Sequence, residues 1–318
     1  AFEDQAAEKK HMTSTQAAQI AKDAQVDKMA LIHYSPRYTD FELKILLDEA
    51  QEVFPNTILS KDRMSFEIPN KDSKKDLALI ELVDFQKKYK NFSACENVNF
   101  LCKDCKITGL LGPNGAGKST IIKAICGVHY PSSGKILVNG ISVEEKTVEA
   151  QKLIGYVSEN AEYPNYYNVY ELIKEVAELR LQNQKSLVNQ QIEKVISIMD
   201  LKDVFLKNVG TLSKGYKQRL SFALALVHDP KVLILDEPVS GLDPMQIVEM
   251  RALIKKLGKE KTILLSTHLM QEAKELCDEI VILHKGKVII TGTVDEICQK
   301  TKTDDLEKAF LVLASEKK

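Results

Sequence analysis

The chain has 318 residues, enough for one large domain or for two unequal ones. Its 44 lysine and arginine residues balance 45 aspartate and glutamate residues, and the net charge of -1 gives no electrostatic reason to expect nucleic acid as the main partner. No run of about 18 apolar residues is present, so the sequence predicts no membrane span, and a membrane role would require a separate subunit.

The six cysteines are scattered through a large chain. This distribution favours reduced thiols in a cytoplasmic compartment over a disulfide framework. Cys102 and Cys105 form a single CxxC. Because no second pair accompanies it, two ordinary thiols near a turn are preferred over a zinc site.

Residues 1–70 carry a helical pattern followed by an apolar strand at Met29–His33, a second helix at Asp40–Val53 and a closing strand near Met64–Ile68. The run Asn70–Asp76 is polar and charged and shows no apolar periodicity. It therefore predicts a linker over residues 71–76, with one domain on either side of it.

From Leu77 to Lys318 apolar strands alternate with helical patterns. This alternation predicts an α/β fold with a mostly parallel sheet that helices cover on both faces. The expected strands are Leu77–Phe85, Lys106–Leu111, Lys152–Val157, Lys231–Asp236 and Thr262–Ser266, and the expected helices are Ser119–Cys126, Val169–Leu181, Leu187–Met199 and Lys217–His228.

The segment between the strand ending at Leu111 and the next helix fits G-x-x-x-x-G-K-[ST]. Its glycines let backbone N–H groups turn inward around phosphate oxygens, and the helix N-terminus adds positive potential. Lys118 can reach the β- and γ-phosphates, and Ser119 can offer a hydroxyl to Mg²⁺. The predicted ATP-binding loop is Gly112, Pro113, Asn114, Gly115, Ala116, Gly117, Lys118, Ser119 and Thr120.

The apolar strand that begins at Val232 ends in two carboxylates, Asp236 and Glu237. Ligands of open α/β sheets bind at the carboxyl ends of the strands, so Asp236 is predicted to reach the Mg²⁺ shell and Glu237 to polarise the attacking water. Taken alone, the pair could be a solvated acidic turn, but the preceding phosphate-binding loop favours the catalytic interpretation. His268 follows another apolar strand and could contact the γ-phosphate.

Together these residues resemble the ATP-binding subunits of ABC transporters over about Leu77 to Lys318. The loop resembles Walker A, Leu233–Glu237 resembles Walker B, and Ser240–Asp243 resembles the D-loop with Asp243. Leu212–Arg219 is similar to the signature motif, His268 to the switch histidine, and Tyr89 to the aromatic residue that stacks on adenine. The resemblance implies a P-loop ATPase core with an antiparallel β subdomain and a helical subdomain at about residues 160–225.

The resemblance also implies an ATPase that works as a head-to-tail dimer, with two copies or two related subunits, on the inner face of a membrane and coupled to a permease. In this chain Ser213 and Gly215 would touch the γ-phosphate held by the partner subunit. Lys214 and Tyr216 stand where the family commonly has glycine and glutamine, and Glu159 stands at the glutamine position of the Q-loop, where a carboxylate can still meet Mg²⁺. These departures are similar to the ATPases of type-2 ABC exporters.

Residues 1–70 resemble the C-terminal end of ribonuclease Z, a tRNA-processing enzyme of the metallo-β-lactamase fold. By that resemblance Glu8 and His11 match a proton-handling pair, and His33 matches a zinc ligand. The main zinc motif, H-x-H-x-D-H, is absent from the sequence, so we expect no nuclease activity and inert histidines. The segment is either the tail of a fusion or the product of two genes joined in error, and its apolar faces are expected to be loosely packed.

Two other functions compete with that of a transporter ATPase. Soluble ABC ATPases of translation usually carry two such domains, and those of DNA repair carry a long coiled coil between the loop and the signature; residues 120–212 show no heptad run. A tRNA-processing enzyme with an appended ATPase would require the zinc motif upstream. The transporter ATPase is therefore the preferred function.

Overall fold

The computed structural model of the chain describes residues 12–24, 26, 28–32, 38–60, 78–90, 92–182 and 184–315. The chain divides into two units, Ala1–Pro69 and Asn70–Lys318. The linker predicted at 71–76, the strand predicted near Met64–Ile68 and the residues Glu8, His11 and His33 lie outside the described residues.

The described part of the first unit contains α2 (Ser14–Asp23), β1 (Met29–Leu31), α3 (Asp40–Val53) and β2 (Thr57–Leu59). Both helices begin with a capping box, in which a threonine and the side chain three residues later satisfy each other's backbone N–H groups. Strands β1 and β2 pair in parallel. The helix predicted at Asp40–Val53 is confirmed, and the short strand β2 is an element that the sequence pattern did not reveal.

Few apolar side chains are buried in the described part of the first unit. Ala18, Ala21 and Ala50 are buried, whereas Phe41 is 74% exposed and Ile32 is 66% exposed. Three alanines offer little apolar area to remove from water. The small buried apolar area of the described residues is therefore consistent with the loose packing expected from the sequence.

The second unit is built around a six-stranded sheet in the order β12-β11-β5-β10-β9-β8. Five of the strands run parallel, and β12 pairs antiparallel with β11 at one edge. The strands are β5 (Ile107–Leu111), β8 (Ile154–Val157), β9 (Val232–Asp236), β10 (Thr262–Thr267), β11 (Glu279–His284) and β12 (Lys287–Gly292). The predicted mostly parallel sheet is thus present.

A second sheet of four antiparallel strands has the order β4-β3-β6-β7. Its strands are β3 (Ala78–Tyr89), β4 (Phe92–Lys103), β6 (Ser133–Val138) and β7 (Ile141–Ser142). Helix α4 (Lys118–Ile125) packs between the two sheets, since its residues Ile121, Ile122 and Ile125 share one core with residues of both sheets.

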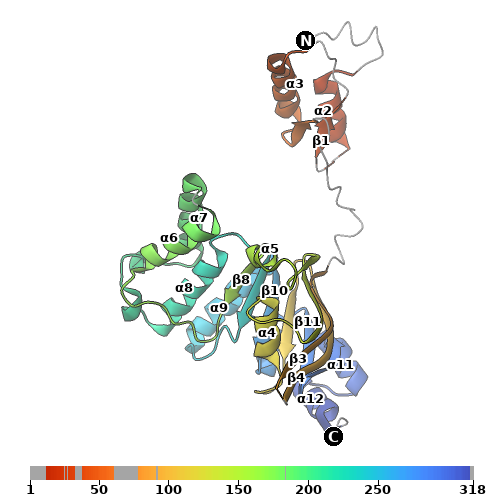
Figure 1. Ribbon diagram of the computed structural model, residues 1–318, viewed down its shortest axis with the longest axis vertical. Coiled ribbons are helices and arrows are strands. Elements are labelled where there is room, and N and C mark those ends of the chain that lie inside the picture. Colours follow the sequence, from red (N-terminus) through yellow and green to blue (C-terminus); the bar gives the residue numbers. More distant parts are fainter. Residues whose placement is uncertain are drawn as a thin grey trace. The chain divides into compact units, whose positions relative to one another are not determined.

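The remaining helices surround the main sheet. In Figure 1, α6, α7 and α8 lie together on one side of the second unit, whereas α11 and α12 lie near the C-terminus. The helices are α5 (Thr147–Lys152), α6 (Val169–Arg180), α7 (Lys185–Ile198), α8 (Lys214–Leu226), α9 (Pro244–Leu257), α10 (Met270–Leu276), α11 (Val294–Thr301) and α12 (Leu306–Ser315), with short 3-10 turns at Lys202–Val204 and Val209–Thr211.

The central strands of the main sheet bury both faces. Along β9, Leu233 and Leu235 pack into the core shared with α6–α9, whereas Val232 and Ile234 pack into the core shared with α4 and the antiparallel sheet. Because successive side chains of a strand point to opposite faces, a strand buried on both faces is apolar throughout. This two-sided burial fixes the carboxyl ends of the strands, where the polar residues follow.

Several predicted bounds are corrected by local chemistry. Helix α8 begins at Lys214 rather than at Lys217, because Ser213 caps it by accepting a hydrogen bond from the backbone of Tyr216 at 3.4 Å. The strand predicted at Lys152–Val157 begins at Ile154, because Thr147–Lys152 forms α5. Strand β3 continues to Tyr89, beyond the predicted end at Phe85.

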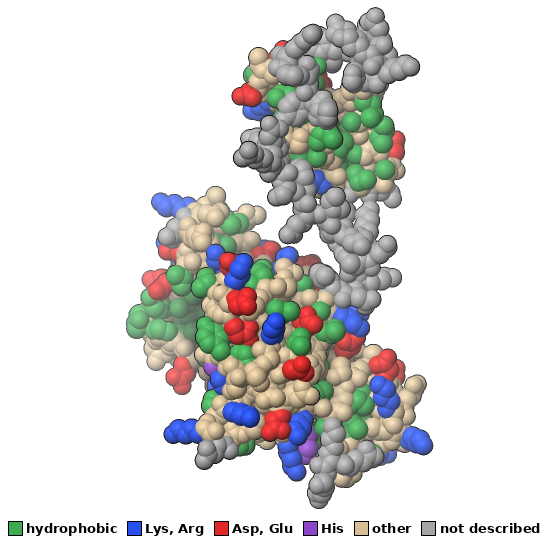
Figure 2. Space-filling view, turned by 45° about the vertical axis from the view of Figure 1, so that its right-hand side comes forward, with side chains coloured by type: hydrophobic (Ala, Val, Ile, Leu, Met, Phe, Trp, Pro, Cys, Tyr) green, Lys and Arg blue, Asp and Glu red, His purple; other side chains and the backbone are tan. Residues whose placement is uncertain are grey.

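The surface of the second unit carries no single-sign field on the face that Figure 2 shows, where acidic and basic side chains are interspersed. A basic stripe of the kind that follows a nucleic-acid backbone is absent from that view. Among the helices of the described residues, none combines the length and the apolar composition needed to cross a membrane.

His228 at the end of α8 gives the fold a testable pH dependence. Burial, reinforced by the charge of Arg180, lowers the pKa of His228 to about 4, and its Nε2 lies 3.1 Å from the carbonyl oxygen of Ile154. In the unfolded chain the imidazole of His228 takes up a proton near pH 6.5, so the free energy of unfolding decreases as the pH falls from about 6.5 towards about 4.

We expect the Tm of His228→Gln, which keeps an N–H donor, to fall less steeply with decreasing pH over this window than the Tm of the wild type. Equal slopes of Tm against pH in the two proteins would contradict the assignment to His228.

Candidate functional site

The carboxyl ends of three neighbouring strands form the base of the site. Strand β10 lies between β5 and β9, with Thr267 beside Leu111 and Ser266 beside Asp236. The loop after β5, the acidic end of β9 and the turn after β10 therefore meet at one edge of the sheet. This edge is where open α/β sheets bind their ligands.

The glycine-rich loop depends on two backbone conformations that favour glycine. Gly115 and Gly117 have φ angles of 80° and 107°, and a Cβ atom at Gly117 would come within 2.9 Å of the Cys95 Sγ. Gly117 is the N-cap of α4 and provides no side-chain cap. The first N–H groups of α4 are therefore left available to an anion at the helix N-terminus.

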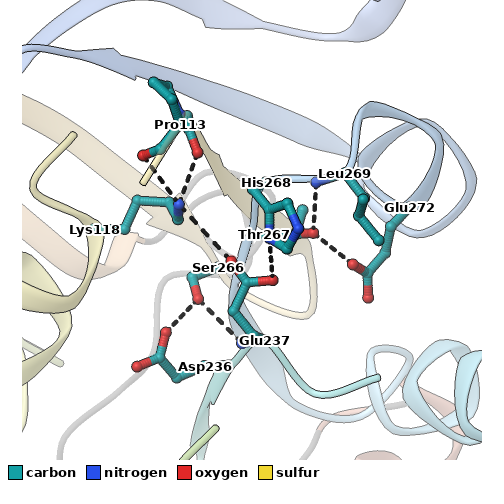
Figure 3. Close-up of polar contacts among 10 residues, drawn as sticks. Pro113, Lys118, Asp236, Glu237, Ser266, Thr267, His268, Leu269 and Glu272 are labelled. Atoms are coloured by element: carbon teal, nitrogen blue, oxygen red, sulfur yellow. Dashed lines mark hydrogen bonds and ion pairs between the residues drawn. The ribbon is translucent and has the colours of Figure 1, made fainter. Parts of the chain in front are cut away.

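Lys118 is buried at the centre of the site (Figure 3). Its Nζ donates to the carbonyl oxygens of Gly112 at 2.7 Å and Pro113 at 3.3 Å, and it lies 3.7 Å from Glu237 Oε1. Burial lowers the pKa of Lys118, while the charges of Glu237 and Asp236 oppose that effect. The ammonium group is thus held among oxygen atoms that a phosphate could replace.

Asp236 is also buried, and a hydroxyl from the neighbouring strand fixes its orientation. Ser266 Oγ donates to Asp236 Oδ1 at 2.5 Å and accepts the backbone N–H of Glu237 at 3.2 Å. Figure 3 shows the serine between the two acidic residues. Ser266 therefore fixes the carboxylate of Asp236 and the backbone of Glu237.

Glu237 faces Lys118 with one oxygen and His268 with the other. Its Oε2 lies 2.9 Å from His268 Nδ1, and its side chain is only 10% exposed, compared with 44% for His268. The backbone of Glu237 has a φ of 48°, a left-handed conformation that is unfavourable for a residue with a Cβ atom. The strained turn directs the carboxylate towards the loop rather than towards solvent.

Tyr89 lies at the end of β3 and is 46% exposed. Its ring meets the edge of the His129 ring with centroids 6.1 Å apart, and Lys87 Nζ lies 5.3 Å from the ring centroid. Burial lowers the pKa of His129, so this ring is favoured in its neutral form. The tyrosine thus offers an exposed aromatic face whose orientation is set by the segment that follows α4.

The other residues predicted for the loop and the metal line the same edge. Ala116 is buried and anchors the loop, because its carbonyl accepts the N–H of Gly286 at 3.0 Å. Asn114, Ser119 and Glu159 are exposed, and Thr120 is half-buried. The charge of Glu159 contributes to the environment of Lys118, whose pKa it raises.

The predicted signature residues Ser213–Tyr216 lie at the N-terminus of α8, outside this cluster. Gln218 Nε2 of the same helix donates to the carbonyl of Pro238 at 2.8 Å, and Arg219 forms a 2.6 Å ion pair with Glu249 of α9. Helix α8 is therefore attached to the segment that follows Glu237.

The predicted D-loop residue Asp243 caps α9 by accepting the backbone N–H of Gln246 at 2.9 Å. Lys214 extends over Gly241, where a Cβ atom would collide with its Nζ. Gln246 packs in the same way against Gly215. Lys214 thus links the signature to the D-loop of its own chain, a contact that a glycine at this position could not make.

The structure brings together Lys118, Asp236, Glu237 and His268, all of which the sequence predicted for the site. It adds Ser266 and Thr267, which sequence reasoning left without a role. A hydroxyl residue at the end of an apolar strand was the available signal, but its partner lies on another strand. Among the described residues no group of three histidine, cysteine, aspartate or glutamate side chains could hold a metal ion by itself.

This arrangement suits the chemistry of a polyphosphate. A buried cation and a free helix N-terminus favour negative charge, while a carboxylate paired with an imidazole can accept a proton from water. Lys118 is the cation, Glu237 the candidate base, and His268 its partner. These groups lie together at the edge where the strands end.

A family model described as "ABC transporter" matches residues 95–240. The chain is 36% identical over 228 residues to the Bacillus subtilis "Uncharacterized ABC transporter ATP-binding protein YhcH", covering 71% of this chain and 73% of the relative. It is also 36% identical over 244 residues to the Escherichia coli "Probable multidrug ABC transporter ATP-binding protein YbhF", covering 74% of this chain. The match spans only 41% of the length of YbhF.

A solved structure described as "Structure of ATP binding subunit of ABC transporter" has the same fold. It superposes with a TM-score of 0.68 at 28% identity, covering 74% of this chain and 99% of that chain. The likeness includes the P-loop α/β architecture of the second unit.

The strained backbone at Glu237 predicts an unusual order of stabilities. Glu237→Gly and Glu237→Ala both remove the carboxylate, but only glycine relieves the left-handed φ, so we expect the glycine variant to be more stable by about 1 kcal/mol. Denaturant unfolding of the two variants measures the difference. Asp236, the last residue of β9, is the control: here the alanine variant should be more stable than the glycine variant. If Glu237→Ala proved as stable as Glu237→Gly, backbone strain at position 237 would be excluded.

Proposed function

The chain belongs to the ABC transporter family, and from that premise we propose that residues 77–318 are the ATP-binding and ATP-hydrolysing subunit of an ABC transporter. The reaction is the hydrolysis of ATP by water to ADP and phosphate, coupled to transport by a separate membrane permease. The observation that carries the proposal is the cluster of Lys118, Glu237 and His268 beside an uncapped helix N-terminus.

In the proposed mechanism, the triphosphate lies in the loop Gly112–Thr120 and replaces the backbone carbonyls as the partner of Lys118. The backbone N–H groups of the loop and of the first turn of α4 receive the phosphate oxygens. Tyr89 offers a face for the adenine ring. Glu237 accepts the proton of the attacking water, and His268 holds the carboxylate and the water in line with the γ-phosphate.

Asp236, Ser119 and Glu159 would hold Mg²⁺ in this proposal, because their oxygen atoms suit that ion. Asp236 has one carboxylate oxygen fixed by Ser266, which orients the group, and Ser119 exposes a hydroxyl at the start of α4. Glu159 supplies a third oxygen donor at the same edge. A small hard cation typically takes one or two protein oxygens together with phosphates and water, and it neutralises charge on the phosphates.

A second ATP-binding subunit is part of the proposal, because Ser213–Tyr216 lie outside the loop cluster of their own chain. An exposed Ser213 at the N-terminus of α8 can complete the site of a partner, in a homodimer or a heterodimer. The permease places the complex on the inner face of the membrane. The name of YbhF, "Probable multidrug ABC transporter ATP-binding protein", favours export as the direction in this proposal.

We propose a separate origin for residues 1–70, as a fragment similar to the C-terminal end of ribonuclease Z with a metallo-β-lactamase-type fold. The parallel pair β1–β2 flanked by α2 and α3 supports an α/β fragment. The residues that carry the resemblance to its site, Glu8, His11 and His33, lie outside the described residues. The fragment contributes no nuclease activity in this proposal.

Replacing the proposed base tests the reaction directly. We expect Glu237→Gln to bind ATP and Mg²⁺ normally but to lower kcat by about 100-fold or more, because the amide cannot accept the proton. The measurement is phosphate release by the full chain, beside nucleotide binding and dimer formation. Turnover at the unchanged rate would exclude Glu237 as the base.

Replacing the proposed phosphate ligand tests the loop. Lys118→Ala removes charge-assisted hydrogen bonds that contribute about 1.5–3 kcal/mol each, so the affinity for ATP should fall at least about 10-fold. Titration with a fluorescent ATP analogue measures the affinity. Because Lys118 is also buried beside Glu237, Tm is recorded for the variant, and unchanged affinity in the folded variant would exclude the loop as the binding site.

A further inference from the structure

The buried hydroxyl of Thr267 and the buried carboxylate of Glu272 lie next to His268, on the side away from Lys118 (Figure 3). Thr267 is fully buried at the end of β10, and Glu272, in the first turn of α10, is 1% exposed. Thr267 Oγ1 donates to Glu272 Oε2 at 2.5 Å. Neither side chain has a role in the reaction proposed above.

The Thr267 hydroxyl holds the chain on both sides of the histidine. Besides donating to Glu272, it accepts the backbone N–H of Leu269 at 3.0 Å. Leu269 is the N-cap of α10 and makes no side-chain cap bond, so the turn has no cap of the usual kind. The backbone N–H that follows His268 is therefore held by the Thr267 hydroxyl, and that hydroxyl is held by Glu272.

The pair carries a penalty for the fold. Glu272 Oε1 has no hydrogen-bond partner among the described residues, and a buried polar atom without a partner destabilises the folded state. Burial raises the pKa of Glu272, and the nearby charge of Glu237 raises it further. Two apolar side chains of similar size could fill this space with little loss of stability, so packing alone does not require a polar pair here.

We infer that Thr267 and Glu272 are positioning residues for His268, which fix the turn that presents the imidazole Nδ1 to Glu237. The inference rests on the proposed ATPase function. Both side chains are buried, and in this inference they act on the reaction only through His268. Glu272 lies on helix α10 and holds Thr267 from there. The helix is a rigid support for His268, whose side chain is 44% exposed.

The first measurement uses the full chain without nucleotide. Histidine ring NMR of the labelled protein reports the environment of His268, whose signal is assigned among the six histidines by its loss in His268→Ala. Thr267→Val should displace the His268 signal, whereas Thr267→Ser, which keeps the hydroxyl, should leave it in place. An undisturbed signal in Thr267→Val would overturn the inference.

The second measurement is steady-state ATP hydrolysis by the same proteins. Thr267→Val should lower kcat by about 10- to 100-fold with KM for ATP changed less than about twofold, since only the orientation of the imidazole is lost. Thr267→Ser should restore kcat to within about threefold of the wild type. Loss of kcat in the serine variant equal to that in the valine variant would overturn the inference.

A double-mutant cycle separates positioning from general stability. In a His268→Ala background, Thr267→Val should lower kcat by less than about twofold, because the residue through which it acts is gone. A full additional loss would show that the pair acts elsewhere and would overturn the inference. An inactive wild type would instead count against the ATPase proposal, and the NMR comparison would still test the positioning role.

Thr267→Val leaves Glu272 without its donor and can unfold the chain. The matched variant is therefore Thr267→Val with Glu272→Leu, which replaces both polar partners by apolar side chains of similar size and should fold with a Tm near that of the wild type. In this folded protein the His268 signal should again be displaced and kcat lowered. Wild-type kcat in the double variant would overturn the inference.

Discussion

The burial of the Lys118 ammonium group is the constraint on which the site depends. An ion removed from water must be compensated by nearby oxygen atoms, and here the carbonyls of Gly112 and Pro113 and the carboxylate of Glu237 supply them. These partners come from the loop after β5 and from the end of β9. The lysine therefore draws two strand ends together, and its lowered pKa records the cost of that burial.

The sheet supplies the rigidity that such a charge cluster needs. Strands β5, β9 and β10 are buried on both faces, so their carboxyl ends cannot shift without disturbing two cores at once. The register of β9 and β10 brings Ser266 beside Asp236, and the hydroxyl then orients the carboxylate. The backbone strain at Glu237 lies directly after the strand, where the surrounding contacts can maintain it.

The sequence predicted the parts of the fold and site that depend on local pattern. The loop Gly112–Thr120, the acidic strand end and His268 each follow an apolar strand, and the structure brings Lys118, Asp236, Glu237 and His268 to one edge of the sheet. Contacts between distant segments were not predictable in this way, and Ser266 meets Asp236 across two strands. The first turn of α8 is a different case, because its signal is local: Ser213 caps the helix through the backbone N–H of Tyr216. Strand β3 was predicted, and the family resemblance implied an antiparallel subdomain, but the pattern did not reveal β4, because register shifts between β3 and β4 break the alternation of apolar residues.

The contacts of α8 connect the catalytic edge to the helices on the far side of the unit. Gln218 holds the carbonyl of Pro238, which follows Glu237 directly, and Arg219 binds Glu249 on α9. Lys214 extends over Gly241 in the loop between them. The segment that follows Glu237 and the helix that carries the predicted signature are therefore held together by these contacts. In the dimer proposed above, these contacts would connect the nucleotide site of one chain to the signature that the same chain offers to its partner. Mutation of Gln218, which removes the contact with Pro238, would measure the strength of the coupling between the two nucleotide sites.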